Sequence, residues 1–149
     1  MIGISACIAG KKCRYDKGHN LNRKIIQTLN QQKKKLIKVC PEMMGGLRVP
    51  RLPAEIQMGD GFDVLSGISQ VFDRSGKLVT DNFIKGSRKA FTKIKNRVEY
   101  VIVKENSPAC GYKHIYNGKF EKKLKKGAGV FTALLLKNKI KIISDEQFK

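Results

Sequence analysis

Four cysteines and one neighbouring carboxylate are the residues of this chain best suited to chemistry. The cysteines are Cys7, Cys13, Cys40 and Cys110, and Glu42 follows Cys40 by two residues in the stretch VCPEMMGG. Thiolates bind soft transition metals and iron–sulfur clusters. A carboxylate beside such a group can carry a proton. The residue types therefore indicate a metal centre with an acid–base residue next to it.

The spacing of the cysteines matches neither a common zinc motif nor a ferredoxin motif. The chain has no Cys-x-x-Cys pair, and Cys7 and Cys13 are six residues apart. Structural zinc sites use four closed ligands and usually include a close cysteine pair. A site with three protein thiolates keeps one metal position open, as catalytic metal sites do. Cysteines are also common as small buried hydrophobic residues, and spacing alone leaves both interpretations open.

The apolar pattern predicts the elements that would position these residues. Short apolar runs predict strands, and apolar residues at helical spacing predict helices. Thr80 is the predicted N-cap of the helix over 80–98. The predicted strands are 2–8, 35–40, 68–72, 100–105 and 139–143, and the predicted helices are 21–32, 80–98 and 128–137. The stretches 41–67 and 106–126 are predicted to be irregular. Alternating strands and helices indicate an α/β fold, a layered sandwich with a mainly parallel sheet flanked by helices.

The predicted topology gives the cysteines a common location. Cys7 and Cys40 lie at the ends of the first two predicted strands, and Cys110 lies in the loop after strand 100–105. The carboxyl ends of parallel strands share one edge of a sheet, where ligands bind. The three cysteines can therefore meet in space, provided that their strands are parallel and close.

Length and composition predict one cytoplasmic domain over residues 1–149. A chain of 149 residues fits one domain, and no apolar run is long enough to span a bilayer. The first residues lack the charged-then-apolar order of a signal peptide. We therefore expect no membrane association, and we expect reduced thiols that are available for metal binding or catalysis.

The net charge is the most unusual feature of the composition. Lys and Arg total 31 against 12 Asp and Glu, which gives a formal net charge of +19. Such a charge attracts nucleotides and nucleic acids at long range. The lysines are scattered and are not interleaved with aromatic residues that could stack on bases. We therefore expect only weak, nonspecific nucleic-acid binding that falls with added salt.

Several stretches of the chain, in order from Gly3 to Leu136, resemble one known family. They are GISACIAG with CRYDKGHN, VCPEMMGGLRVPR with PAEIQMGDGFDVLSG, KENSPACGYKHIYNGKF, and GAGVFTALLL. Together they are similar to the domain of unknown function 523 family, whose characterised members are 2-thiouracil desulfidases. Several long matches in register are far more specific than any single short motif.

The resemblance implies a cofactor, a reaction and a set of site residues. It implies a 4Fe–4S cluster on Cys7, Cys40 and Cys110, with the fourth iron free for the sulfur of a thiolated pyrimidine. Glu42 falls on the catalytic carboxylate of the family, and Ser107 falls on its catalytic serine. The implied substrate is a small thiolated nucleobase, nucleoside or nucleotide, whose C=S group is exchanged for C=O with water.

The chain departs from the family pattern at two positions. Ala109 replaces the middle serine of a stretch that commonly reads SPSCG, and Cys13 is an additional thiol that we leave out of the ligand set. A fourth-ligand role for Cys13 would close the cluster and weaken the enzyme interpretation. Two other classes of function remain open at this point: an iron–sulfur redox or sulfur-carrier protein, and a basic RNA-binding domain with a structural zinc.

Further candidates lie in the matched loops. Arg14, Arg48 and Arg51 are suited to hold a substrate phosphate or carbonyl, and pairing with Asp60 or Asp63 is their structural alternative. The glycines of KKGAGV open a predicted helix and can bind an anion with backbone N–H groups. Close packing of that helix is the simpler explanation for these glycines.

Overall fold

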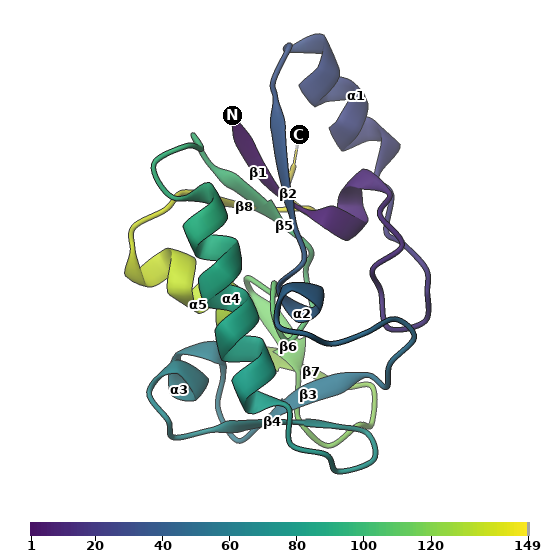
Figure 1. Cartoon of the computed structure of the whole chain (residues 1–149), viewed down its shortest axis with the longest axis vertical. Coiled ribbons are helices and arrows are strands. Elements are labelled where there is room, and N and C mark those ends of the chain that lie inside the picture. The colour runs from purple at the N-terminus through teal and green to yellow at the C-terminus, as the bar shows by residue number, and fades with distance from the viewer. Residues whose placement is uncertain (149) are drawn as a thin grey trace.

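The computed structural model describes residues 1–148 and is built around a four-stranded parallel sheet (Figure 1). In spatial order the strands are β2 (Leu36–Val39), β1 (Ile2–Ser5), β5 (Val101–Val103) and β8 (Ile142–Ser144). All neighbouring pairs in this sheet are parallel. The predicted α/β class with a mainly parallel sheet is therefore confirmed.

Helices cover both faces of the sheet, because successive side chains of a strand point to opposite faces. Helix α1 (Arg23–Gln31) lies on one face, and helices α4 (Thr80–Ile94) and α5 (Val130–Lys137) lie on the other (Figure 1). In β5, Ile102 packs into the core with α1, whereas Val101 and Val103 pack into the core with α4 and α5. A strand buried on both faces is apolar throughout, which is the pattern that predicted a strand over 100–105.

The two stretches predicted to be irregular contain short elements, so that prediction was wrong in part. In the first stretch, strand β3 (Ala54–Gln57) pairs antiparallel with β4 (Gln70–Asp73), which agrees with the predicted strand 68–72, and in the second β6 (His114–Tyr116) pairs antiparallel with β7 (Leu124–Lys126). The first stretch also contains the short helices α2 (Pro41–Met44) and α3 (Gly61–Leu65), and a further short helix, η1 (Ala6–Ala9), follows β1. Elements of three to five residues are too short to show a period, and β7 is largely exposed and rich in lysine.

Three details of the predicted elements need correction. The first strand ends at Ser5, and the chain then turns into η1 instead of continuing to residue 8. Helix α4 ends at Ile94, short of the predicted end at residue 98. Thr80 is the first residue of α4 and not its N-cap, because its hydroxyl oxygen accepts a hydrogen bond from the N–H of Val71 at 2.9 Å.

Within residues 1–148, no helix is both long enough and apolar enough to cross a membrane.

Candidate functional site

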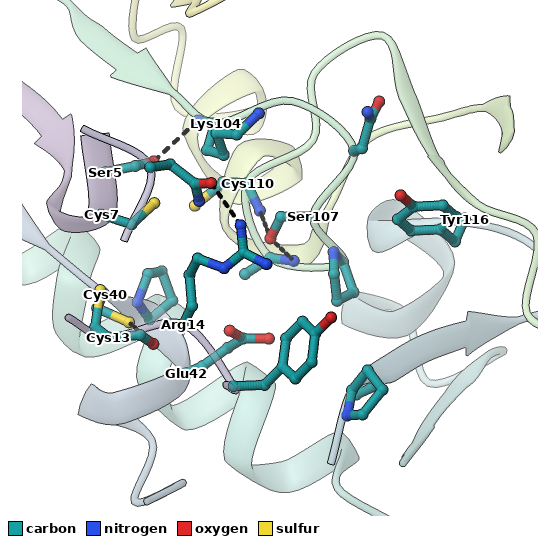
Figure 2. Close-up of a pocket in the computed structure, with 18 of the residues that line it drawn as sticks. Ser5, Cys7, Cys13, Arg14, Cys40, Glu42, Lys104, Ser107, Cys110 and Tyr116 are labelled. Carbon is teal, nitrogen blue, oxygen red and sulfur yellow. Dashed lines mark hydrogen bonds between the residues drawn. The ribbon is translucent and has the colours of Figure 1, made fainter. Parts of the chain in front are cut away.

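A cavity of about 480 Å³ lies at the carboxyl end of the parallel strands. All four cysteines line it, together with Glu42 and Ser107 (Figure 2). The cysteines come from segments that follow β1, β2 and β5, which are neighbours in the sheet. The structure thus brings together the residues that the sequence placed at this edge, and it adds Cys13 to them.

Cys7 and Cys13 reach the cavity from a tight turn after β1. Helix η1 ends at Gly10, whose φ of 92° lies in the left-handed region that favours glycine. The chain then folds back, and the N–H of Asn20 donates to the Cys7 carbonyl at 2.9 Å. This return places Cys13 in the same cavity as Cys7, with only 3% of its surface exposed.

Cys40 and Glu42 are presented by the short helix α2. Cys40 is its N-cap, and Pro41 occupies the first helical position, where its fixed φ suits a helix start. The helix lies directly on α4, and a Cβ atom added at Gly86 would lie 1.7 Å from the Pro41 carbonyl oxygen. Only glycine permits this approach, which fixes α2 on the body of the fold. Figure 2 shows the Glu42 carboxylate pointing into the cavity.

The loop that carries Ser107 and Cys110 is held by hydrogen bonds at its tip. The Ser107 hydroxyl oxygen accepts from the N–H groups of Ala109 at 3.0 Å and Cys110 at 3.1 Å. The Thr132 hydroxyl, on α5, donates to the Cys110 carbonyl at 2.8 Å. Ser107 therefore shapes the turn that presents Cys110, and its own hydroxyl hydrogen is not used in these bonds.

The same loop rests on the amino end of α5, which accounts for the glycines of KKGAGV. The N–H groups of Val130 and Phe131 donate to the carbonyls of Pro108 and Ala109, each at 2.9 Å. A Cβ atom added at Gly129 would lie 2.4 Å from the Ala109 carbonyl carbon. These helix N–H groups are therefore occupied by the cysteine loop, so they position Cys110 and are not free for an anion.

A buried carboxylate anchors the far end of this loop. Glu105 is 3% exposed, and its Oε1 accepts from the N–H groups of Tyr112 at 2.6 Å, Lys113 at 2.8 Å and His114 at 3.2 Å. Its Oε2 accepts from the Ser144 hydroxyl at 2.7 Å. Burial opposes ionisation, but the hydrogen bonds outweigh it and hold the pKa of Glu105 below its usual value.

Glu105→Gln is expected to destabilise the fold by about 2–3 kcal/mol, because it replaces hydrogen bonds to a charged acceptor. The pKa of Glu105 is lower in the folded chain, so its contribution is full above the unfolded value of about 4.3 and is lost as pH falls through the folded value. Chemical denaturation at several pH values measures this difference. Glu121→Gln, at an exposed position, is the matched control. Equal stability of wild type and Glu105→Gln at neutral pH would contradict the anchoring role.

The thiols of the cavity differ in their readiness to ionise. A hydrogen bond from the Cys13 thiol is the main cause that lowers the pKa of Cys40 to about 7, and it also lowers the pKa of Cys7. The same bonds, first to Cys40 and then to Cys7, raise the pKa of Cys13. Burial raises the pKa of the Cys110 thiol. Cys7 and Cys40, whose pKa values are lowered, are therefore the more readily ionised thiols of the cavity.

The three arginines have different surroundings. Arg14 bonds Asp16 at 3.0 and 3.2 Å and the Asn20 side chain at 2.8 Å. Arg48 is exposed. Arg51 Nη2 donates to Glu42 Oε2 at 2.6 Å, in an ion pair of largely buried side chains.

The alternative pairing of these arginines with Asp60 or Asp63 was wrong. Those two aspartates form a capping box at the start of α3. Asp60 also accepts from the N–H of Ala128 at 3.2 Å. Both carboxylates therefore serve local structure at this end of the fold.

Sequence reasoning missed two features of this site. It did not place Cys13 at the cavity, although the stretch CRYDKGHN that begins with Cys13 closely follows GISACIAG, which contains Cys7. It also missed the pair between Arg51 and Glu42. These residues are nine positions apart and joined by a stretch without a periodic pattern, so no sequence signal pointed to their contact.

The residues of the cavity fit an iron–sulfur cluster. Within residues 1–148, no three His, Cys, Asp or Glu side chains converge on one single-ion position. The thiols instead line a cavity, and thiolates are the ligands that hold such clusters. Arg51 Nη1 is buried and has no hydrogen-bond partner among the described residues. It is a donor that an anionic group in the cavity would satisfy.

Comparison with known proteins gives three matches over nearly the whole chain. A family model described as 2-thiouracil desulfurase matches residues 2–147. The uncharacterized protein YbbK of Bacillus subtilis (strain 168) is 40% identical over 148 residues, which are 99% of this chain and 97% of YbbK. A solved structure of the 4Fe–4S-dependent thiouracil desulfidase TudS is 34% identical, with a TM-score of 0.83, and the match covers 99% of this chain and 91% of that one.

Proposed function

Because the chain belongs to the 2-thiouracil desulfurase family, we propose that it is a 4Fe–4S-dependent desulfidase that removes sulfur from thiolated pyrimidines. The proposed reaction exchanges C=S for C=O with water and releases the sulfur as sulfide. The substrate is a 2-thiouracil-like base, or its nucleoside or nucleotide. The match to TudS, itself a 4Fe–4S-dependent thiouracil desulfidase, supports both the cofactor and the reaction.

The observation that carries the proposal is one cavity in which four thiols and a carboxylate from three separate segments of the chain come together. Cys7, Cys40 and Cys110 line this cavity together with Glu42. We assign the three cysteines as the cluster ligands, which leaves one iron without a protein ligand. Cys13 lines the same cavity but is left out of the set, as an additional thiol beyond the three that the family resemblance implies.

The cluster, when bound, supplies an iron that prefers soft sulfur and acts as a Lewis acid towards a thiocarbonyl group. Glu42 accepts a proton from the water that attacks the ring carbon. Its carboxylate points into the cavity beside the cysteines (Figure 2). Glu42 therefore serves as the base for the attack of the water.

Ser107 orients the attacking water or the base. Its oxygen already accepts two backbone N–H groups, so the hydroxyl hydrogen remains available for donation into the cavity that it lines. Because the same oxygen shapes the turn of Cys110, Ser107 links the cluster ligand to the reacting water.

The walls of the cavity suit a flat, polar ring. Tyr15 and Tyr116 line it and are 41% and 36% exposed, so their rings are accessible to a pyrimidine. Arg74 and Lys122 also line it and give it positive charge. We propose a cytoplasmic small-molecule enzyme, in which the net charge of +19 adds only weak, nonspecific nucleic-acid binding.

Anaerobic reconstitution with iron and sulfide, followed by a sulfide-release assay, tests the proposal. The panel contains 2-thiouracil and 4-thiouracil and their nucleosides and nucleotides. We expect about four iron atoms per chain and release of one sulfide per oxygenated pyrimidine formed. A fully reconstituted protein that releases no sulfide from any member of the panel would overturn the enzyme proposal. If that protein underwent reversible one-electron reduction, an iron–sulfur redox protein would become the favoured function in place of a desulfidase.

A further inference from the structure

Arg51 connects two of the segments that form the cavity. Its side chain is only 10% exposed, and its Nη2 donates both to Glu42 Oε2 at 2.6 Å and to the Cys13 carbonyl at 2.9 Å. Its backbone N–H donates to the Tyr15 carbonyl at 2.8 Å. One buried guanidinium thus joins helix α2, which carries Glu42, to the loop of Cys13.

The contact fixes which carboxylate oxygen of Glu42 is occupied. Oε2 lies 2.6 Å from Arg51 Nη2, the distance of a strong charge-assisted hydrogen bond. Glu42 makes no other side-chain hydrogen bond within residues 1–148 than this one, so Oε1 is left free. A planar guanidinium that is itself held at the Cys13 carbonyl restricts rotation of the carboxylate.

A purely structural ion pair is a poor explanation for this arrangement. Arg51 Nη1 is buried without a partner among the described residues, and an unpaired buried donor destabilises a fold. Buried ion pairs are themselves weak evidence for stability. A buried polar atom without a partner calls for an explanation such as a catalytic role or a bound ion, and Arg51 lines the cavity.

We propose that Arg51 is the positioning residue for Glu42: it binds Oε2 and holds Oε1 towards the cavity, where Oε1 accepts the proton of the attacking water. This inference rests on the proposed desulfidase function and deepens it, because it assigns the working oxygen and names the residue that sets it. Arg51 acts through Glu42 and does not itself need to touch the substrate.

A double-mutant cycle tests the inference. Arg51→Met keeps the aliphatic length and removes the guanidinium. In the reconstituted enzyme we expect Arg51→Met to lower kcat about tenfold or more, and to change kcat by less than about threefold in a Glu42→Gln background, because residues that act through one group are not additive. Arg51→Lys should lose less than Arg51→Met, since an ammonium can still bind Oε2.

Three further measurements distinguish positioning from damage to the site. Iron per chain should show the same cluster content in Arg51→Met and wild type. The substrate-induced change in the visible spectrum should give the same Kd for the two proteins, within about threefold. Arg97→Met, at an exposed position that does not line the cavity, is the matched control and should behave as wild type. The unfolding midpoints of the cluster-free proteins should be non-additive for Glu42→Ala and Arg51→Met, since each of these changes removes the contact between the two side chains.

The outcomes that overturn the inference differ from those that overturn the proposed function. Equal kcat losses from Arg51→Met in the wild-type and Glu42→Gln backgrounds, or loss of iron in Arg51→Met, would overturn the positioning role. Additive unfolding midpoints would overturn the pair itself, without any assay of activity. A wild type that holds its cluster but releases no sulfide would overturn the proposed function, and the assignment of Oε1 as proton acceptor would fall with it.

Discussion

Glu42→Gln is expected to keep the iron–sulfur cluster and to lower turnover about a hundredfold or more, the usual scale for a lost acid–base group. Glutamine has the size and hydrogen-bonding shape of glutamate, but its amide is not a base. The substituted glutamine can still present its carbonyl oxygen to Arg51, so helix α2 and Cys40 should remain in place. The loss belongs to proton transfer in the transition state, and substrate affinity should therefore change much less than kcat.

The measurement combines three readings on one anaerobic preparation: iron per chain, Kd from the spectral change on adding 2-thiouracil, and the rate of sulfide release. Glu146→Gln, at an exposed position of the described chain, is the matched control and should leave all three unchanged. Normal iron together with normal turnover in Glu42→Gln would remove this carboxylate from the mechanism. Loss of iron would instead show that Glu42 organises the start of α2, a carboxylate being a common first-turn residue of a helix.

The parallel sheet could be predicted because its strands are buried on both faces. Val101, Ile102 and Val103 are each fully buried, and such a run of β-branched residues has no other simple explanation in a chain of this size. The edge location of Cys7 and Cys40 followed from the predicted strand ends together with the expected parallel sheet, although β1 ends at Ser5 and Cys7 lies in η1. The elements predicted best were therefore those whose hydrophobic pattern directly reflects which of their faces are buried in the fold.

The features that could not be predicted depend on which distant residues the irregular segments bring into contact. The turn at Gly10 brings Cys13 back beside Cys7, and the segment after α2 brings Arg51 back to Glu42. Neither return leaves a periodic pattern, because each depends on single hydrogen bonds such as that from the Arg51 N–H to the Tyr15 carbonyl. These same segments line the cavity, so local pattern was least informative where the chemistry is concentrated.

Replacing Cys40 with serine is expected to remove most of the iron, from about four atoms per chain to fewer than about one, and with it all measurable sulfide release. Serine is nearly the same shape as cysteine, but its hydroxyl is a hard and weakly acidic group that binds iron poorly compared with a thiolate. Two remaining thiolates are too few to hold a cluster that already has only three protein ligands. Cys7→Ser and Cys110→Ser should give the same loss.

Cys13→Ser is the matched comparison, because Cys13 lines the same cavity and is 3% exposed, yet is not assigned as a ligand. Its hydroxyl can replace the thiol as a donor to Cys7 and Cys40, so iron content should remain near that of wild type. Far-ultraviolet circular dichroism of the cluster-free proteins separates ligand loss from misfolding. That control matters most for the buried Cys13 and Cys110, and least for the half-buried Cys7 and Cys40. Cys40→Ser is therefore the deciding variant: full iron content in it would remove Cys40 from the ligand set. Loss of iron in Cys13→Ser would make Cys13 a fourth ligand, close the open iron position, and favour an electron-transfer protein over a desulfidase.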